Sequence, residues 1–217
     1  MNNTMLSKCS NKGAEMLKTS RGGHKQLLRS RCNEKYAALT DEYMAEANTA
    51  MAAKIFDLPE YVSASTVFCY MSMPREAGTD EIIERALADG KRVCIPLCVD
   101  KCIMEAREYK AGDGLAEGAY GIREPLESAP LVEPQEIDFA VIPCVTCDRE
   151  GNRLGHGAGY YDRFMSEGTF TRAALCYDKI LATNVPVIDT DIPMNMVVTE
   201  SEVYVRDEDP KNYLRRY

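Results

Sequence analysis

The stretch DFAVIPCVTCDREGNRLGHGAGYYDRF, residues 138–164, decides the fold class of this chain. It begins as an apolar run, which is typical of a strand buried on both faces of a parallel sheet. Alternating glycines follow at positions 155, 157 and 159, and a helical pattern begins there. A glycine stretch that follows a strand and opens a helix lies where ligands bind in α/β folds, outside the carboxyl ends of the strands.

The rest of the chain continues this alternation of strands and helices. Helices are expected over residues 22–39, 40–59, 79–90 and 159–167, and strands over residues 65–71, 92–99, 102–109, 137–148, 172–178 and 194–205. Thr40 is placed to cap the second helix, and Thr79 and Gly90 to begin and end the third. Residues 124–136, which contain three prolines, are expected to form a surface loop. This order predicts an α/β fold, with three α/β/α layers around a largely parallel sheet.

Length and composition are ordinary for a globular protein. The 217 residues are enough to bury a full core. We expect residues 1–22 to be an N-terminal extension and residues 23–217 to form a single domain that acts as a monomer. The net charge of −8, without a long basic run, argues against nucleic acid as a partner. No stretch resembles a signal peptide or a membrane helix, and the nine cysteines are scattered, so we expect a cytoplasmic protein with no membrane partner.

The three alternating glycines are suited to bind an anion. Glycine adopts positive φ without strain and lets backbone N–H groups approach a ligand closely. The N-terminus of the following helix points at the same place, which favours phosphate. The spacing is neither the G-x-G-x-x-G of dinucleotide-binding folds nor a mononucleotide loop ending in G-K-[ST]. A flexible turn between strand and helix is the alternative that the spacing leaves open.

Charged and aromatic residues flank these glycines. Arg153 precedes them, and Asp162 lies in the first turns of the helix, where it either holds a magnesium–phosphate complex or interacts favourably with the helix dipole. Tyr160 and Tyr161 are adjacent and point in different directions. We therefore expect one tyrosine in the core and the other beside a flat, conjugated ligand.

The same stretch resembles the signature of the 5-formyltetrahydrofolate cyclo-ligases, also called methenyltetrahydrofolate synthetases. Their pattern is an apolar strand ending in Pro, followed by D-x-x-G-x-R-L-G-x-G-x-G-Y-Y-D, and ten residues between Asp148 and Asp162 match it. The resemblance covers residues 23–205. Further segments that fit are KQLLR (25–29), YMSMPREAGTDEII (70–83), YGIREP (120–125) and VPVIDTDIPMNMVVTES (185–201).

This resemblance implies an ATP- and Mg²⁺-dependent ligase whose partners are small molecules, a reduced folate and ATP. The reaction closes 5-formyltetrahydrofolate to 5,10-methenyltetrahydrofolate and releases ADP and phosphate. Transfer of the γ-phosphoryl group to the formyl oxygen makes that oxygen a leaving group, which N10 of the folate then displaces. Phosphoryl transfer depends on positioning and charge stabilisation, so no protein nucleophile is required.

The resemblance also implies the site residues. Arg153 and Tyr160 take catalytic roles, and Asp162 and Asp191 hold Mg²⁺, which prefers oxygen ligands. The residues bordering the folate are Met73, Glu76 and Tyr160. The ATP-binding residues are Lys25, Arg29, Arg153, Leu154, Gly155, His156, Gly157, Ala158, Gly159, Tyr160 and Tyr161. Without the resemblance, the residues alone indicate a solvated helix face at Lys25 and Arg29, a loop acid at Glu76 and a turn at Asp191.

Other readings remain open. His156 stands where many members have arginine, and Gly78 where some have an acidic residue, so the chain is alternatively a homologue that binds nucleotide or folate without efficient turnover. Cys144 and Cys147 have the C-x-x-C spacing of a redox pair or of half a zinc site. Sugar-phosphate isomerases and acyl-CoA transferases share related folds, but a fold alone does not specify chemistry.

Overall fold

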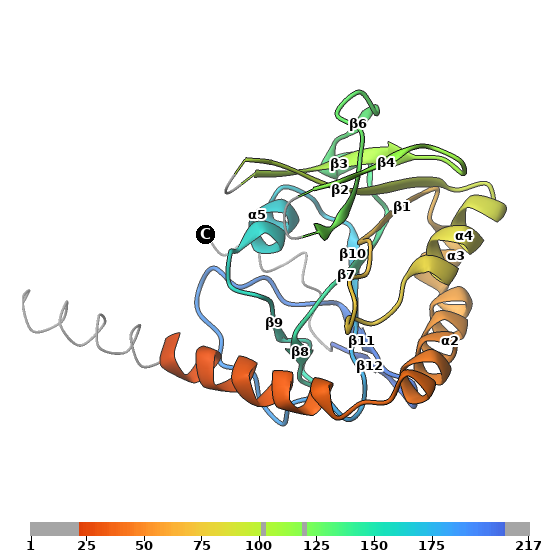
Figure 1. Cartoon of the computed structure of the whole chain (residues 1–217). Helices are drawn as coiled ribbons and strands as arrows, with labels where there is room; N and C mark the ends of the chain where they lie inside the picture. Colours follow the sequence, from red (N-terminus) through yellow and green to blue (C-terminus); the bar gives the residue numbers. More distant parts are fainter. Residues whose placement is uncertain (1–21, 101–102, 119–120, 207–217) are drawn as a thin grey trace, which may run out of the picture.

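The structure, a computed structural model, describes residues 22–100, 103–118 and 121–206. All but the last residue of the expected N-terminal extension, residues 1–22, lies outside the described residues. One sheet holds the strands β1 (Thr66–Cys69), β2 (Arg92–Asp100), β3 (Ile103–Tyr109), β6 (Leu131–Val132), β7 (Phe139–Ile142), β10 (Thr171–Leu175), β11 (Met196–Val198) and β12 (Val203–Val205). Their order across the sheet is β12-β11-β10-β7-β1-β2-β3-β6 (Figure 1).

The middle of this sheet is parallel. Neighbouring pairs from β11 through β10, β7 and β1 to β2 run in the same direction. Antiparallel strands, β12 on one side and β3 with β6 on the other, complete the edges. All residues of β1, β7 and β11 are buried, because helices and loops cover both faces. The expected α/β fold with a largely parallel sheet is confirmed.

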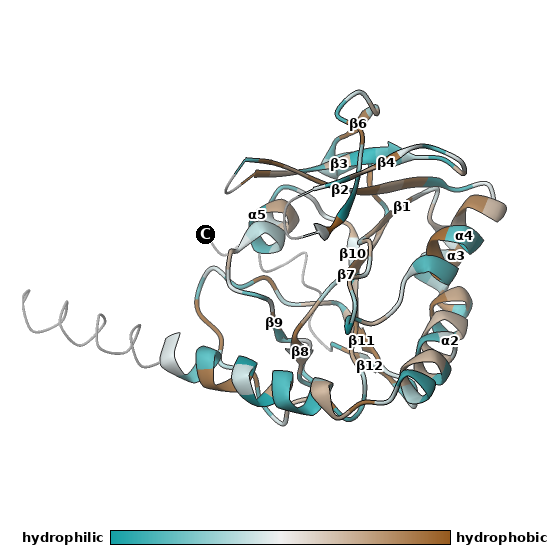
Figure 2. Ribbon diagram, in the orientation of Figure 1, coloured by the Kyte–Doolittle hydropathy of each residue, from teal (hydrophilic) through white to brown (hydrophobic). Residues whose placement is uncertain are grey.

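Helices lie on both sides of the central strands. One group comprises α2 (Asp41–Asp57), α3 (Pro59–Ser63) and α4 (Asp80–Ala88), and α5 (Tyr160–Ser166) lies on the opposite side (Figure 1). A further helix covers residues 22–37. Both hydropathy colours appear on α4, which buries Ile82, Ile83 and Ala86 against the sheet (Figure 2). No helix in the described part of the chain is long and apolar enough to cross a membrane.

The two expected helix caps behave differently. The Thr40 side chain accepts a hydrogen bond from the Tyr43 backbone N–H at 3.2 Å, so it caps α2 as predicted. Thr79 precedes α4, but its hydroxyl makes no capping bond and instead donates to the Tyr70 carbonyl oxygen at 2.7 Å. The predicted start of the helix at Thr79 is confirmed, but the expected side-chain cap is not formed, because the hydroxyl connects the end of β1 to the start of the helix. Gly90 has a φ of 75°, as expected of the residue that ends a helix.

Two segments of the structure differ from the secondary structure that the sequence predicts. The expected strand over residues 137–148 divides into β7 and β8 (Thr146–Cys147) on either side of Pro143, and β8 pairs with β9 (Arg153–Leu154) in a separate small sheet. Proline has no N–H for a strand ladder, which accounts for the break. Residues 124–136, expected as a loop, contain the edge strand β6 and a 3₁₀ turn, Pro134–Glu136. The first two residues of this segment also belong to β5 (Arg123–Pro125), which forms a hairpin with β4 (Leu115–Glu117).

The Thr40 cap gives a stability prediction. Thr40→Ala removes the hydrogen bond to the first turn of α2, so we expect the free energy of unfolding to fall by about 1 kcal/mol. Thr49→Ala is the matched control, because Thr49 is exposed inside the same helix and alanine has the higher helix propensity. Urea unfolding measures both. Equal stability of the two variants would contradict the cap.

Candidate active site

A cavity of about 1050 Å³ lies beside the carboxyl ends of β1 and β7. Tyr70 and Met71, which follow β1, and Pro143, which follows β7, contribute to its wall. The cavity also gathers every residue predicted for the site, namely Lys25, Arg29, Met73, Glu76, Arg153, Leu154, Gly155, His156, Gly157, Ala158, Gly159, Tyr160, Tyr161, Asp162 and Asp191. Segments that are far apart in the sequence therefore meet around one space, although the role of each residue stays a prediction.

The glycine loop between β9 and α5 is packed against guanidinium groups. Gly157 and Gly159 have φ angles of 110° and 73°, a region that favours glycine. A Cβ atom would lie 2.8 Å from Arg153 Nη1 at Gly155, 3.3 Å from Arg29 Nη2 at Gly157, and 2.8 Å from Arg163 Nη1 at Gly159. Any side chain would displace these groups. The glycines thus allow three cations to lie against one short loop, which is suited to an anion with several charges.

Arg153 is a buried cation with two structural partners. Its Nη1 donates to the Pro143 carbonyl oxygen at 3.0 Å, and its Nη2 donates to Asp162 Oδ2 at 3.0 Å. The residue is only 7% exposed, and its Nε has no hydrogen-bond partner within the described part of the chain. A buried charge is stable only when it is paired and hydrogen-bonded, so Asp162 holds this guanidinium in the cavity wall.

Arg29 reaches the same loop from the helix over residues 22–37. Its Nε donates to the Gly155 carbonyl oxygen at 2.8 Å. Burial lowers the pKa of Arg29, and the nearby Asp191 carboxylate opposes that shift. Arginine keeps its charge at neutral pH, so Arg29 remains a cation beside the loop.

The two carboxylates predicted to hold a metal lie near one backbone segment. Asp191 accepts hydrogen bonds from Lys25 Nζ at 2.7 Å and from the Ile188 N–H at 2.8 Å. Asp162 accepts a hydrogen bond from the Ile192 N–H at 3.2 Å. Among the described residues, no group of three or more His, Cys, Asp or Glu side chains is arranged to hold a metal ion. Two carboxylates nevertheless fit Mg²⁺, which usually takes one or two from the protein and its other ligands from water and phosphate.

His156 contacts a carboxylate across the cavity. Its Nε2 lies 3.3 Å from Glu76 Oε1, and its side chain is 63% exposed. The other oxygen of Glu76 accepts a hydrogen bond from the Met73 N–H at 2.9 Å. The glycine loop and the segment predicted to border the folate are therefore connected by this pair.

Gly78, the second departure from the family pattern, is explained by packing. Its N–H donates to Asn48 Oδ1 at 2.9 Å, and a Cβ atom there would lie 2.6 Å from Asn48 Nδ2. Tyr177 also donates to Asn48 Oδ1, at 2.8 Å. Because Asn48 is fixed by these bonds, glycine fits at this position without displacing it.

The expectation for the tyrosine pair is met in part, because both residues line the cavity and both also pack against the core. The Tyr160 hydroxyl donates to the Asp100 carbonyl oxygen at 3.1 Å. The Tyr161 ring packs edge-on against Phe68, with ring centroids 6.4 Å apart. Burial raises the pKa of Tyr161, so its hydroxyl stays protonated at neutral pH. The two side chains at the start of α5 therefore have different neighbours, Asp100 for Tyr160 and Phe68 for Tyr161.

Sequence reasoning missed part of the wall. Arg163 directly follows the G-Y-Y-D motif, and Glu124 lies within YGIREP, so both were next to recognised signals. The other unpredicted wall residues include Gly22, Tyr70, Met71, Pro96, Cys98, Met104, Ile122, Pro143, Ser166, Ile188, Thr190 and Ile192. Most of these carry no reactive group, and only the folded chain brings them to the cavity.

Cys144 and Cys147 are buried free thiols. Cys144 Sγ donates to the Leu175 carbonyl oxygen at 3.2 Å. The neighbouring Cys147 thiol and burial raise the pKa of Cys144, and burial raises that of Cys147. The thiolate is the reactive form, so this environment favours packing residues over a redox pair or a zinc site.

The defining sequence pattern of the 5-formyltetrahydrofolate cyclo-ligase family matches residues 21–200. The chain belongs to this family. It is 27% identical over 196 residues to the probable 5-formyltetrahydrofolate cyclo-ligase of Schizosaccharomyces pombe, covering 82% of this chain and 96% of the relative. It is 30% identical over 173 residues to the 5-formyltetrahydrofolate cyclo-ligase of Escherichia coli K12, covering 77% and 95%.

Solved structures agree with the cyclo-ligase assignment. The NMR structure of Aquifex aeolicus 5,10-methenyltetrahydrofolate synthetase superposes with a TM-score of 0.77 at 27% identity, covering 85% of this chain and 93% of that one. The Mycoplasma pneumoniae 5,10-methenyltetrahydrofolate synthetase shares the fold at 19% identity, with a TM-score of 0.67, covering 81% and 98%. The predicted family and the prediction of an enzyme of the ligase class are confirmed.

The packing of the glycine loop gives a binding prediction. Gly157→Ala places a side chain at a φ of 110° and against Arg29, so we expect the affinity for ATP to fall about tenfold through the loss of a charge-assisted contact. Gly112→Ala is the matched control, because Gly112 has a φ of 89°, has open space around it, and is not part of the cavity wall. Calorimetric titration with ATP measures both variants. A similar loss in the two would mean that backbone strain alone is responsible.

Proposed function

We propose that this cyclo-ligase family member catalyses the ATP- and Mg²⁺-dependent closure of 5-formyltetrahydrofolate to 5,10-methenyltetrahydrofolate, with release of ADP and phosphate. One observation carries the proposal. The cations of the glycine loop, the two carboxylates and the residues predicted to border the folate all line a single cavity. A cavity of about 1050 Å³ is large enough to place two ligands in contact, as transfer between them requires.

The glycine loop forms the triphosphate end of this site. Backbone N–H groups, Arg29 and Arg153 surround the space where three glycines remove side-chain bulk. Guanidinium groups make paired hydrogen bonds to phosphate oxygens, and their positions are fixed before the ligand arrives. Lys25 adds a positive charge from the helix over residues 22–37 and forms an ion pair with Asp191.

Asp162 and Asp191 are the residues that would hold Mg²⁺. A bound magnesium ion neutralises phosphate charge and orients phosphate oxygens. In the protein itself, Asp162 balances the buried Arg153 charge, and Asp191 balances Lys25. Each carboxylate is thereby kept in place beside the phosphate end of the cavity.

The chemistry then follows from placing the formyl group against the γ-phosphorus. The formyl oxygen of the folate attacks that phosphorus, the bond to the β-phosphate oxygen breaks, and ADP leaves. N10 attacks the activated formyl carbon, the carbon–oxygen bond breaks, and inorganic phosphate departs while N10 loses its proton. Arg153 lies where it would stabilise the negative charge of the transferred group, and Tyr160 borders both ligands at the start of α5.

The folate end is lined by apolar and aromatic residues together with Glu76. Met73, Tyr160 and Tyr161 supply surfaces on which a flat ring packs. Glu76 is mostly buried and contacts His156, so this pair connects the folate end of the cavity to the glycine loop.

A single assay tests this function. Purified protein is mixed with Mg²⁺, ATP and 5-formyltetrahydrofolate, and the near-ultraviolet absorbance of the methenyl product is followed. ATP-dependent growth of that absorbance is the expected result. Binding of ATP without product would instead identify a homologue that has lost turnover.

Asp162 gives a sharper kinetic prediction. Asp162→Asn keeps the size of the side chain but removes the charge that balances Arg153 and would hold Mg²⁺. We expect a folded protein with at least about a hundredfold lower kcat, since removal of one electrostatic contact to the transition state costs about 10²-fold or more. Glu167→Gln, an exposed change at the end of the same helix, is the control. Unchanged kcat in Asp162→Asn, with a normal circular dichroism spectrum, would limit Asp162 to a structural role.

A further inference from the structure

Glu124 is a buried acid in the cavity wall that the proposed reaction does not yet use. It lies on β5 and is only 6% exposed. It lines the same cavity as the glycine loop and Glu76. Among residues 22–100, 103–118 and 121–206, no lysine, arginine or histidine forms an ion pair with it. By contrast, Asp162, Asp191 and Glu76 each have a basic partner.

The donors that reach the Glu124 carboxylate from the described residues are weak and come from Cys98 on β2. Its Oε1 accepts a hydrogen bond from the Cys98 N–H at 3.3 Å, a long distance for such a bond. The side chain packs over Gly118, where a Cβ atom would overlap the carboxylate itself. Burial, then the charge of Glu124 and a hydrogen bond to it, raise the pKa of the Cys98 thiol to about 11. The thiol is therefore neutral and is a weak donor to the carboxylate.

This environment is unfavourable for an acid unless a ligand completes it. A carboxylate offers about four acceptor positions, and burying it without donors costs free energy. The cavity beside Glu124 is lined by apolar groups such as Pro96, Met104 and Ile122, which supply no donors. A flat ligand that carries N–H groups on one edge would pack against these side chains and donate to Glu124.

We propose that Glu124 is a substrate-binding residue that accepts hydrogen bonds from the N–H edge of the pterin ring. This inference rests on the proposed function, because it requires a reduced folate in the cavity. A pterin has a 2-amino group and a ring N3–H side by side, and these two donors match the two oxygens of one carboxylate as an arginine fork does. Glu124, which has no basic partner among the described residues, is better suited to this edge than Glu76, which already contacts His156 and the Met73 N–H.

The assignment divides the roles of the two acids. Glu76 contacts the glycine loop through His156, so its substitution should affect both ligands. Glu124 lies on β5 in the β4–β5 hairpin, and its carboxylate accepts a hydrogen bond from the Cys98 N–H on β2. Among the described residues, no hydrogen bond joins its side chain to the glycine loop. Its substitution should therefore affect the folate alone.

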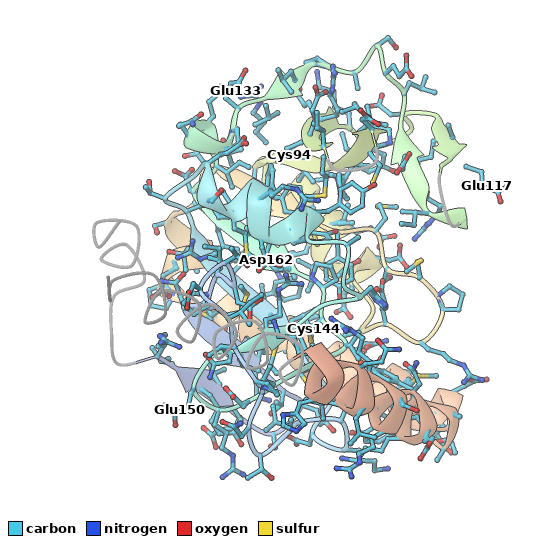
Figure 3. All side chains as sticks on the ribbon, turned by 90° about the vertical axis from the view of Figure 1, so that its left-hand side faces the viewer. Cys94, Glu117, Glu133, Cys144, Glu150 and Asp162 are labelled. Atoms are coloured by element: carbon cyan, nitrogen blue, oxygen red, sulfur yellow. The ribbon has the colours of Figure 1, made fainter. Side chains whose placement is uncertain are left out.

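The test compares two identical substitutions on one hairpin. Glu124→Gln replaces an acceptor oxygen with an N–H donor, whereas Glu117→Gln makes the same change on an exposed side chain that projects from the edge of the molecule (Figure 3). Equilibrium binding of 5-formyltetrahydrofolate and of ATP is measured separately by calorimetry. We expect Glu124→Gln to weaken folate binding at least about tenfold and to leave ATP binding unchanged, as loss of a hydrogen bond to a charged group requires. Folate binding equal to that of Glu117→Gln would overturn the proposal.

A ligand series makes the same test on the unmodified protein. Wild type should bind a 2-desamino analogue of the folate at least about tenfold more weakly than the parent compound. In Glu124→Gln this difference should largely disappear, because the contact is already lost. Equal binding of both compounds by wild type would overturn the assignment, even if the variant did not fold.

The outcomes also separate this inference from the proposed function. Wild type that binds 5-formyltetrahydrofolate but forms no methenyl product would contradict the proposed reaction. The comparison of the parent folate with its 2-desamino analogue would still test the Glu124 contact. Wild type that forms product while Glu124→Gln retains full folate affinity would contradict only the Glu124 assignment.

Discussion

The buried guanidinium of Arg153 connects the parallel sheet to the helix that begins at the glycine loop. It donates to the carbonyl oxygen of Pro143, directly after β7, and to the carboxylate of Asp162 in α5. These two bonds fix the distance between the end of the strand and the start of the helix. The glycine loop leads into this helix, and the cavity lies beside it.

This arrangement depends on absent side chains as much as on present ones. Guanidinium groups occupy the space next to three glycines, where a Cβ atom would displace them. Most of the charges are already paired before a ligand arrives, Arg153 with Asp162 and Lys25 with Asp191. Such a site is preorganised, because few groups must move or lose water when phosphate charge enters. Glu124 lacks such a partner among the described residues, and this asymmetry distinguishes the folate end of the cavity.

Local sequence patterns predicted most of the elements because their causes are local. The apolar runs became β1, β2 and β7, and Thr40 caps α2 through a bond that spans three residues. The predictions failed where a side chain had a distant alternative. The Thr79 hydroxyl bonds to the end of β1 and not to its own helix, and Pro143 interrupts a run that is apolar on both sides.

The sequence by itself determined the α/β alternation, the glycine loop and the family, because the order and spacing of residues along the chain carry that information. Only the tertiary structure decided which charges meet. Lys25 and Asp191 are 166 positions apart, and His156 and Glu76 are 80 apart. These pairs form because crossover connections join the parallel strands. The segments that follow the strands therefore meet at one edge of the sheet, although they are far apart in the sequence. The tertiary structure also decided that Glu124 is buried without a basic partner among the described residues. The burial of an acid is recognised only when its surroundings are known.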